Sequence, residues 1–443
     1  ALEHGHIGFS YSVFDNLYGT VAEPGVRIDQ NSDRWDFSSE IGAIDTFVNR
    51  VKVRAAHTDY MHQEIEDGEI ATTFKNRGLE TSIELGHVPI GRFSGVVGFQ
   101  LQNSRFEALG DEAFVPSNST KSKALYIYEE LPLDILKAED LKLSFGARTE
   151  HVEIESDGGA RFGDASSADF KPYSAALGAL YALNEQWSLA TNLSHNERAP
   201  SYFELFANGP HLATAQYEVG DSDLEKERSN GVDVQLRWKA DKHSFKVGAY
   251  YTRFSNFISL SSTGRSIGLD GELDPVDANN DGIADVSLEE ILPEAQFLAV
   301  PAVFKGLEAE AKFHIYEGRG DLDLNLRADY VHATNRDTGD PLPRISPLRL
   351  GFGLDYAFQR FSSRLEVLHA FKQDRTAPNE LATDEYTQVN ALMAYRLPST
   401  FHLEAFAKAN NLLNQEIREH SGFLKDIAPL GERSLLLGLR GEF

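Results

Sequence analysis

Hydrophobic and polar residues alternate at every second position along much of the chain. In residues 321–330 (DLDLNLRADY), leucine, alanine and tyrosine interleave with aspartate, asparagine and arginine. Successive side chains of a β-strand point to opposite faces, so this pattern predicts strands with one apolar and one charged face. The same rhythm recurs in residues 231–238, 245–251, 348–356 and 401–407.

About eighteen such runs of roughly ten residues are present, a length typical of tilted membrane strands. Their connections alternate between tight and long. The tight ones are expected at Asp45–Thr46, Val88–Pro89, Asn184–Glu185, Ala240–Asp241, Gln359–Arg360 and Pro398–Thr400. The long ones are expected at 20–32, 108–119, 157–167, 198–224, 263–294, 375–382 and 415–431.

Strict alternation of short and long connections is typical of outer-membrane barrels, which have short periplasmic turns and long extracellular loops. The sequence therefore predicts an all-β fold, an antiparallel transmembrane barrel with about 18 strands in this chain. If the long connections are extracellular, the first strand, about residues 5–18, runs toward the cell surface. The last strand, 433–443, then runs toward the periplasm. The loops 198–224 and 263–294 then share one rim.

Composition narrows the function classes. The 443 residues carry 42 basic and 68 acidic side chains, a net charge of −26, so no nucleic-acid partner is expected. The acidic charge over lumen and loops is expected to attract cations. There is no Cys, which excludes thiol catalysis and thiolate metal sites. No stretch is apolar enough for a membrane helix, and no G-x-S-x-G motif supports an enzyme.

The last residues, 433–443 (RSLLLGLRGEF), place Leu435, Leu437, Leu439 and Phe443 on one face. This resembles the signal by which the barrel assembly machinery recognises bacterial outer-membrane proteins. No linker or fixed repeat is present, so residues 1–443 are interpreted as one barrel domain.

Three motifs resemble TonB-dependent receptors, the energised importers of bacterial outer membranes. The form RAPS..EL occurs from Arg198 to Ser201 with Glu204 and Leu205. A G..L..E.S segment follows from Gly220 to Ser229, and a late N-L-L begins at Asn411. The stretches GPHLAT, YEVGDSDLEKERSN, NNLLNQ, HSGFL, DYMHQE and LGHVPIGR are most similar to ZnuD-type zinc receptors.

This resemblance implies zinc as the transported ligand, outer-membrane lipid and lipopolysaccharide as surroundings, and the TonB–ExbB–ExbD system as partner through a plug domain. Family members hold that plug inside a barrel of twenty-two strands. Against about eighteen strands here, the plug and roughly four opening strands are expected to be missing. Zinc receptors often carry a His-rich extracellular loop after the strand equivalent to residues 5–18, but the loop at that position here, residues 20–32, contains no His.

Candidate zinc ligands follow from strand parity, because zinc favours His and carboxylate where thiolate is absent. On the strand 48–64, Val51 and Val53 mark the lipid face, so His62 and Glu64 point together into the lumen near its mouth. His211 lies in the loop 198–224. By resemblance, Glu64 and His211 match zinc-binding positions of ZnuD-type receptors, with further ligands on the plug.

Loop 263–294 contains a second candidate site. The segment DANNDGIAD spaces its oxygen ligands around Gly282 like the first positions of a calcium loop. The acid expected at the twelfth position is Leu288, and Glu289 follows one residue later. The calcium candidates are Asp277, Asn279, Asp281 and Asp285, within residues 277–289.

Two other functions are compatible with the sequence. One is a siderophore or haem receptor, for which an acidic chain is a poorer electrostatic match. The other is a passive porin-like channel, since a plug-free barrel of this size would hold water. The receptor motifs favour an importer of a metal ion, most notably zinc.

Overall fold

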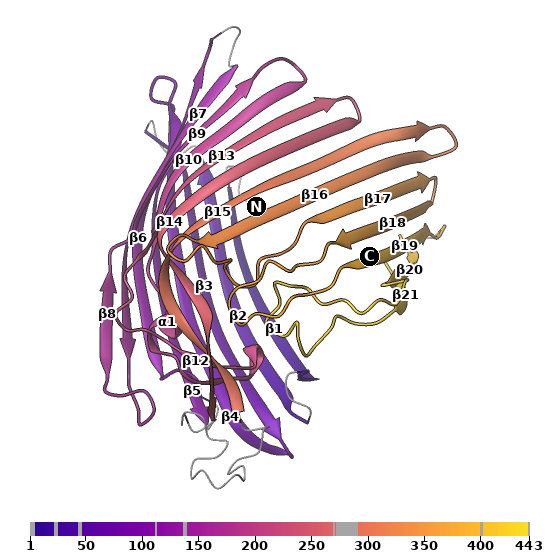
Figure 1. Ribbon diagram of the computed structural model, residues 1–443. Helices are drawn as coiled ribbons and strands as arrows, with labels where there is room; N and C mark the ends of the chain where they lie inside the picture. Colours follow the sequence, from indigo (N-terminus) through magenta and orange to yellow (C-terminus); the bar gives the residue numbers. More distant parts are fainter. Residues whose placement is uncertain are drawn as a thin grey trace. The chain divides into compact units, whose positions relative to one another are not determined.

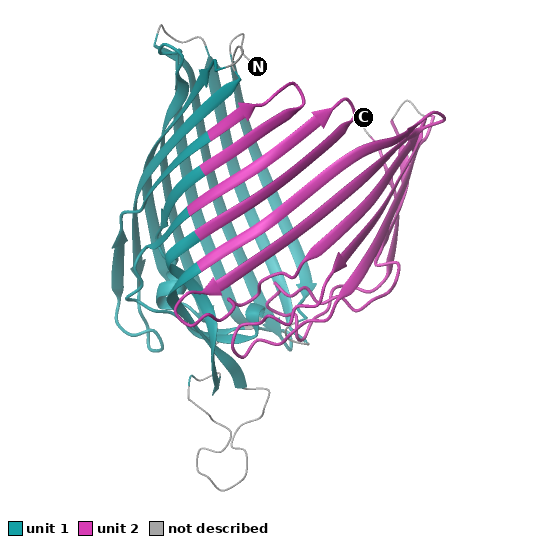
Figure 2. Cartoon of the chain, turned by 45° about the horizontal axis from the view of Figure 1, so that its top comes forward, with its two compact units in different colours: residues 1–178, 193–230, 253–302 teal, residues 179–192, 231–252, 303–443 magenta. Residues whose placement is uncertain are grey.

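The computed structural model describes residues 5–21, 25–42, 47–110, 113–135, 140–268, 271, 291–398 and 402–441. The chain falls into two units, which Figure 2 draws in different colours. Unit 1 comprises residues 1–178, 193–230 and 253–302. Unit 2 comprises residues 179–192, 231–252 and 303–443.

The described residues are almost entirely β-structure. The strands of unit 1 are β1 (Gly5–Gly19), β2 (Arg27–Gly42), β3 (Val48–Glu66), β4 (Glu69–His87), β5 (Ser94–Gly110), β6 (Asn118–Leu133), β7 (Leu141–Ser156), β8 (Ser166–Phe170), β11 (Asn208–His211) and β12 (Gln216–Val219). The same unit contains the helix α1 (Tyr202–Phe206) and the 3-10 helix η1 (Leu212–Thr214). No helix within the described ranges is long and apolar enough to cross a membrane.

The strands of unit 2 are β16 (Asp321–Asn335), β17 (Arg349–Phe358), β18 (Phe361–Ala370), β19 (Tyr386–Arg396), β20 (Glu404–Asn410) and β21 (Ser434–Arg440). Five further strands have residues in both units: β9 (Tyr173–Ala182), β10 (Trp187–Arg198), β13 (Glu227–Ala240), β14 (His243–Gly268) and β15 (Ile291–Glu317).

Strands that follow one another in sequence pair antiparallel within each unit. In unit 1, β1 pairs with β2 from Gly5 opposite Ile41 to Gly19 opposite Arg27. The same ladder continues from β2 to β8. In unit 2, β16 to β19 run alongside one another in sequence order (Figure 1), and the pairing continues to β21. The predicted all-β antiparallel fold is confirmed.

The apolar face of the strands stays uncovered. Leu326 of β16 lies opposite Phe352 of β17, and each is 40% exposed. On β21, Leu437 is 70% exposed. Water-soluble proteins seldom expose large contiguous apolar surfaces, whereas transmembrane strands alternate apolar residues toward lipid with polar residues on the other face. The exposed side chains therefore mark the lipid-facing side of the strands.

The strand count agrees with the sequence-based expectation once strand length is considered. The described residues form 21 strands, of which β8, β11 and β12 have only four or five residues each. Setting these three aside leaves 18 strands of seven residues or more, which is the predicted number, although β20 and β21 with seven residues each are shorter than the predicted runs. The short ones carry too few residues to show a period of two.

Several predicted loops are shorter than expected, because the strands extend beyond them. The predicted loop 20–32 is wrong in its second half, since Arg27 already pairs with Gly19. The strict alternation of tight and long connections also fails between β3 and β4. Strands β3 and β4 are 19 residues each and are joined by only Asp67 and Gly68. Beyond the apolar band, Asp59 and Arg77 form an exposed ion pair at 3.3 Å on this hairpin, as expected for a part surrounded by water.

The described parts of the two longest predicted loops lie together at one end of unit 1. Tyr217 to Val219 of β12, within the loop 198–224, pair in parallel with Glu294 to Gln296 of β15. The main apolar core lies at the same end. It is formed by Val115, Val152, Ile154, Leu205, Ala207, Leu224, Ile258, Leu260, Ala295 and Phe297.

Candidate metal-binding region

The connection between β10 and β11 begins with an ion-pair network. Arg198 ends β10 and donates to both carboxylate oxygens of Glu204 in α1, at 2.7 and 3.0 Å. It also contacts Glu227 at 3.2 Å. Glu204 accepts the backbone N–H of Ser201 at 2.7 Å, which places its charge at the N-terminus of α1. The motif RAPS..EL therefore has a structural role, because it fixes the start of this connection.

The strands β11 and β12 form a small hairpin that carries His211. Its Nδ1 lies 2.8 Å from Oε1 of Glu218, a side chain only 3% exposed. Thr214 donates to the same oxygen at 2.8 Å. Because a carboxylate only accepts hydrogen bonds, Nδ1 of the neutral imidazole carries the proton and Nε2 keeps its lone pair. Metal-binding histidines are usually held in this way.

His62 and Glu64 lie two residues apart on β3. The hydroxyl of Tyr60 is 3.0 Å from Nδ1 of His62, so residues 60 and 62 share one face of the strand, as the parity predicts. The imidazole of His62 stacks on Phe74 of β4, with 4.5 Å between ring centroids. Glu64 lies opposite Thr72 at a β-bulge, and its Oε2 is buried.

One apolar cluster of unit 1 connects the two predicted histidines. Its residues are Phe74, Ala108 and Ala113, with Phe106, Phe114 and Phe162 packed against them. His62 stacks on Phe74, and the ring of His211 stacks on Phe114 at 4.0 Å with an angle of 4° between the planes. The structure thus brings His62 and His211 to the same cluster. In the part of the chain that the structure describes, no three His, Asp or Glu side chains are arranged to hold a metal ion.

The calcium candidates Asp277, Asn279, Asp281 and Asp285 lie outside the described residues.

The late motif N-L-L directly follows β20 in unit 2. Asn411 is 1% exposed, and its side chain donates to the carbonyl of Gln415 at 2.8 Å. Its amide oxygen accepts the backbone N–H of Gln415 at 3.1 Å. This second family motif therefore shapes the turn after β20.

Sequence reasoning missed a buried ion pair between the connections 371–385 and 411–433 of unit 2. Nε2 of His420 lies 3.2 Å from Oε1 of Glu380, and the two side chains are 1% and 9% exposed. Nδ1 of His420 is 3.0 Å from the hydroxyl of Thr383. Forty residues separate the pair, so no local spacing pointed to it.

The surroundings of Glu380 favour its charged form. Burial by itself raises the pKa of this carboxyl. The contact with His420 and the hydrogen bonds from the backbone N–H groups of Ala377 and Arg344 act in the opposite direction and prevail. The pKa of Glu380 therefore lies below its ordinary value.

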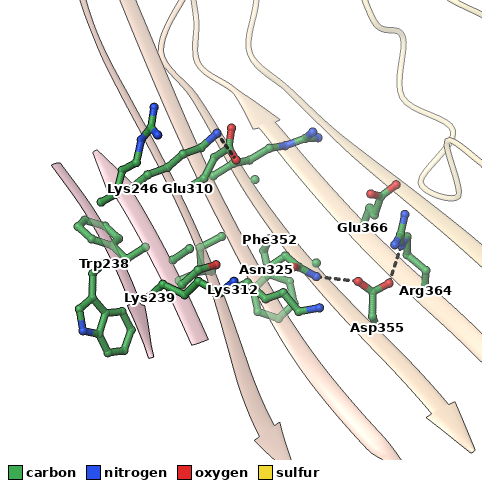
Figure 3. A pocket seen from close by; sticks show the side chains of 18 residues that line it. Trp238, Lys239, Lys246, Glu310, Lys312, Asn325, Phe352, Asp355, Arg364 and Glu366 are labelled. Atoms are coloured by element: carbon green, nitrogen blue, oxygen red, sulfur yellow. Dashed lines mark hydrogen bonds and ion pairs between the residues drawn. The ribbon is translucent and has the colours of Figure 1, made fainter. Parts of the chain in front are cut away.

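A pocket of about 700 Å³ lies in unit 2 and is lined by residues of the six strands from β13 to β18 (Figure 3). Lys246 lies 2.9 Å from Glu310, and Asp355 accepts from Asn325 and Arg364 at 2.7 and 2.5 Å. Six basic and three acidic side chains line it. Basic residues therefore outnumber acidic ones in this pocket although the chain as a whole is acidic.

The comparison with protein families settles the class of the protein. The family described as TonB dependent receptor-like, beta-barrel matches residues 6–412. The chain belongs to this family of outer-membrane receptors, and its location is the bacterial outer membrane. The family and the matched structures are receptors and transporters.

Solved structures show the same fold. The copper transporter OprC is 16% identical with a TM-score of 0.80, and the match covers 100% of this chain and 69% of that chain. For the apoprotein form of the FrpB iron transporter from Neisseria meningitidis these values are 12%, 0.72, 98% and 68%. For the ferric citrate transporter FecA in its unliganded form they are 16%, 0.66, 94% and 62%. At such low identity these matches describe the fold alone.

Proposed function

We propose that the complete protein is a TonB-dependent importer of a metal ion, with zinc as the substrate. The observation that carries this proposal is the hydrogen bond between His211 and the buried Glu218, which leaves Nε2 of His211 available to a metal. His62 at the same apolar cluster adds a second nitrogen, and Glu64 adds carboxylate oxygen on the same strand. Nitrogen and oxygen ligands of this kind suit zinc.

Zinc needs about four ligands in a closed site, so the remaining ones are assigned to the plug that the family carries. Energy for import would come from the TonB–ExbB–ExbD system through that plug. The solved structures OprC, FrpB and FecA are longer than this chain, which spans 62 to 69% of their lengths. Transport is therefore proposed for the whole receptor.

The decisive experiment compares zinc binding by the full-length receptor with binding by the double variant Glu64→Ala/His211→Ala, using calorimetry in detergent. We expect at least about a 10-fold loss of affinity if both are direct ligands. The matched control is His57→Ala/Asp59→Ala, a histidine and a carboxylate on the opposite face of β3. Unchanged affinity in the first variant would remove Glu64 and His211 from the site.

A second function is supported by the basic pocket of unit 2. Its excess of Lys and Arg favours an anionic ligand such as a metal chelate with carboxylate groups. The same calorimetry with a ferric chelate in place of zinc separates the two. Tight binding of the chelate and none of zinc would overturn the assignment of zinc.

A further inference from the structure

A second histidine with carboxylate neighbours lies in unit 2 at the turn between β15 and β16. His314 precedes this turn, and its side chain is only 10% exposed. Its Nδ1 lies 2.8 Å from Oδ1 of Asp323. The other oxygen of Asp323 is 2.7 Å from Nζ of Lys312. Asp323 therefore uses both carboxylate oxygens to hold two neighbouring side chains.

This arrangement directs the lone pair of the imidazole. Asp323 is a carboxylate paired with Lys312, so it accepts and Nδ1 of the neutral His314 donates. Nε2 is then the acceptor nitrogen. It is buried and has no hydrogen-bond partner among the described residues. Oδ1 of Asp321 and Oε2 of Glu317 lie 3.6 and 3.7 Å from it.

These two distances exceed those of a hydrogen bond but resemble the spacing of ligands around one ion. Zinc binds His nitrogen and carboxylate oxygen at about 2.0–2.2 Å, so two ligands of a tetrahedral site lie roughly 3.3–3.5 Å apart. Glu317 and Asp321 are 69% and 59% exposed, so both can turn toward Nε2. Rotation of these two exposed side chains toward Nε2 is what the three groups need to surround one ion.

We propose that His314, Glu317 and Asp321 bind a divalent transition-metal ion, with Asp323 as a positioning residue. The three groups are not assembled as a complete site in the described structure. Nζ of Lys242 lies 2.9 Å from Oε2 of Glu317, so the ion must displace this ammonium group. One nitrogen and two oxygens suit zinc, copper or nickel better than calcium or magnesium.

Asp323 acts through His314. A carboxylate that accepts from the remote imidazole nitrogen fixes the tautomer and raises the basicity of the metal-binding nitrogen. The candidate site in unit 1 has the same feature in Glu218 and His211. The two groups share no residue, so each can be tested with the other removed.

The test uses zinc as the probe and the full chain in detergent, in the Glu64→Ala/His211→Ala background. We expect His314→Gln and the pair Glu317→Gln/Asp321→Asn each to weaken zinc binding at least about 10-fold, since each removes ligands. Asp323→Asn should cost about 10- to 100-fold, as is usual for a residue that orients a ligand.

The matched control is Glu225→Gln/Glu416→Gln. These carboxylates are 74% and 65% exposed and each is paired with an arginine, so the control removes the same charge elsewhere. It should leave zinc affinity unchanged. Lys242→Met should raise the affinity several-fold, because it removes the competing ammonium group.

Circular dichroism checks that each variant is folded. If His314→Gln does not fold, the Glu317→Gln/Asp321→Asn variant still tests the proposal, because both of these side chains are exposed. Two outcomes overturn the proposal. One is zinc affinity that does not change in the Glu317 and Asp321 variant. The other is an equal loss in the control, which would mean that only bulk charge attracts the ion.

Discussion

Glu218 and His211 face each other across the β11–β12 hairpin, with 2.8 Å between Oε1 and Nδ1. The carboxylate is buried while the imidazole is partly exposed. The hydrogen bond to this buried carboxylate therefore fixes the orientation of the imidazole. Its other nitrogen, Nε2, stays accessible. The contact with Glu218 therefore determines which nitrogen of His211 can bind a metal ion.

The first prediction concerns this orientation. Glu218→Gln should lower zinc affinity of the full-length receptor by about 10- to 100-fold without removing a ligand. Nitrogen chemical shifts of His211 give the tautomer directly, and a purely structural role of Glu218 would leave the Nδ1-protonated form in place. The control is Glu225→Gln, an exposed glutamate beyond the hairpin. Zinc affinity and tautomer unchanged in Glu218→Gln would contradict the prediction.

The second prediction concerns the motif at the end of β10. Arg198→Lys cannot keep the two parallel hydrogen bonds to Glu204, because lysine donates from a single point. Roughly 1.5–3 kcal/mol of local stability should be lost, the usual value of hydrogen bonds to charged groups. Hydrogen exchange at the backbone N–H of Gly220, which bonds to the carbonyl of Ala207 at 2.7 Å, measures this loss.

Arg92→Lys provides the comparison for this variant. Arg92 and Asp134 pair at 2.8 Å with both side chains about half exposed. An exposed ion pair contributes little to stability, so hydrogen exchange at Gly220 should be nearly the same in Arg92→Lys as in wild type. Equal protection of Gly220 in wild type and Arg198→Lys would show that the network does not hold the connection.

The long strands could be predicted because membrane strands impose a period of two over many residues. Residues 321–330 alternate without interruption, and the structure places them in β16. The ends of strands were less predictable. Beyond the bilayer both faces meet water, so residues 27–32 lost the apolar alternation while remaining paired in β2. The short strands β11 and β12 gave no periodic signal.

The candidate site was predictable only where its residues are close in sequence. His62 and Glu64 share a face because they are two residues apart on one strand. Glu218 was missed because its contact with His211 exists only after the hairpin forms. The pair Glu380 and His420 depends on two connections that meet in the folded state, so spacing along the chain carries no information about it.

The third prediction uses the lowered pKa of Glu380. A carboxyl with a folded pKa below its unfolded value stabilises the fold above the unfolded pKa, near 4.5. That stability is lost as the pH falls through the folded pKa. Hydrogen exchange in the connections 371–385 and 411–433 should therefore show protection at neutral pH that disappears progressively below about 4.5.

Glu380→Gln is the variant that tests this cause. It should show weak protection at neutral pH, because buried His420 loses its charged partner, and little further change on acidification. Glu419→Gln changes an exposed neighbour and should behave like wild type. A wild-type protein that keeps full protection at pH 3 would sink the explanation.

The fourth prediction distinguishes the two faces of the last described strand. Leu437 lies opposite Ala407 and is 70% exposed, whereas Leu436 lies opposite Lys408 on the polar face. Leu437→Arg puts a guanidinium into lipid and should destabilise the protein by about 2–4 kcal/mol near the bilayer midplane. Leu436→Arg adds the same group on the wet face and should cost far less. Urea unfolding in lipid vesicles measures both, and equal losses would mean that the assignment of faces on β21 is reversed or that neither face meets lipid.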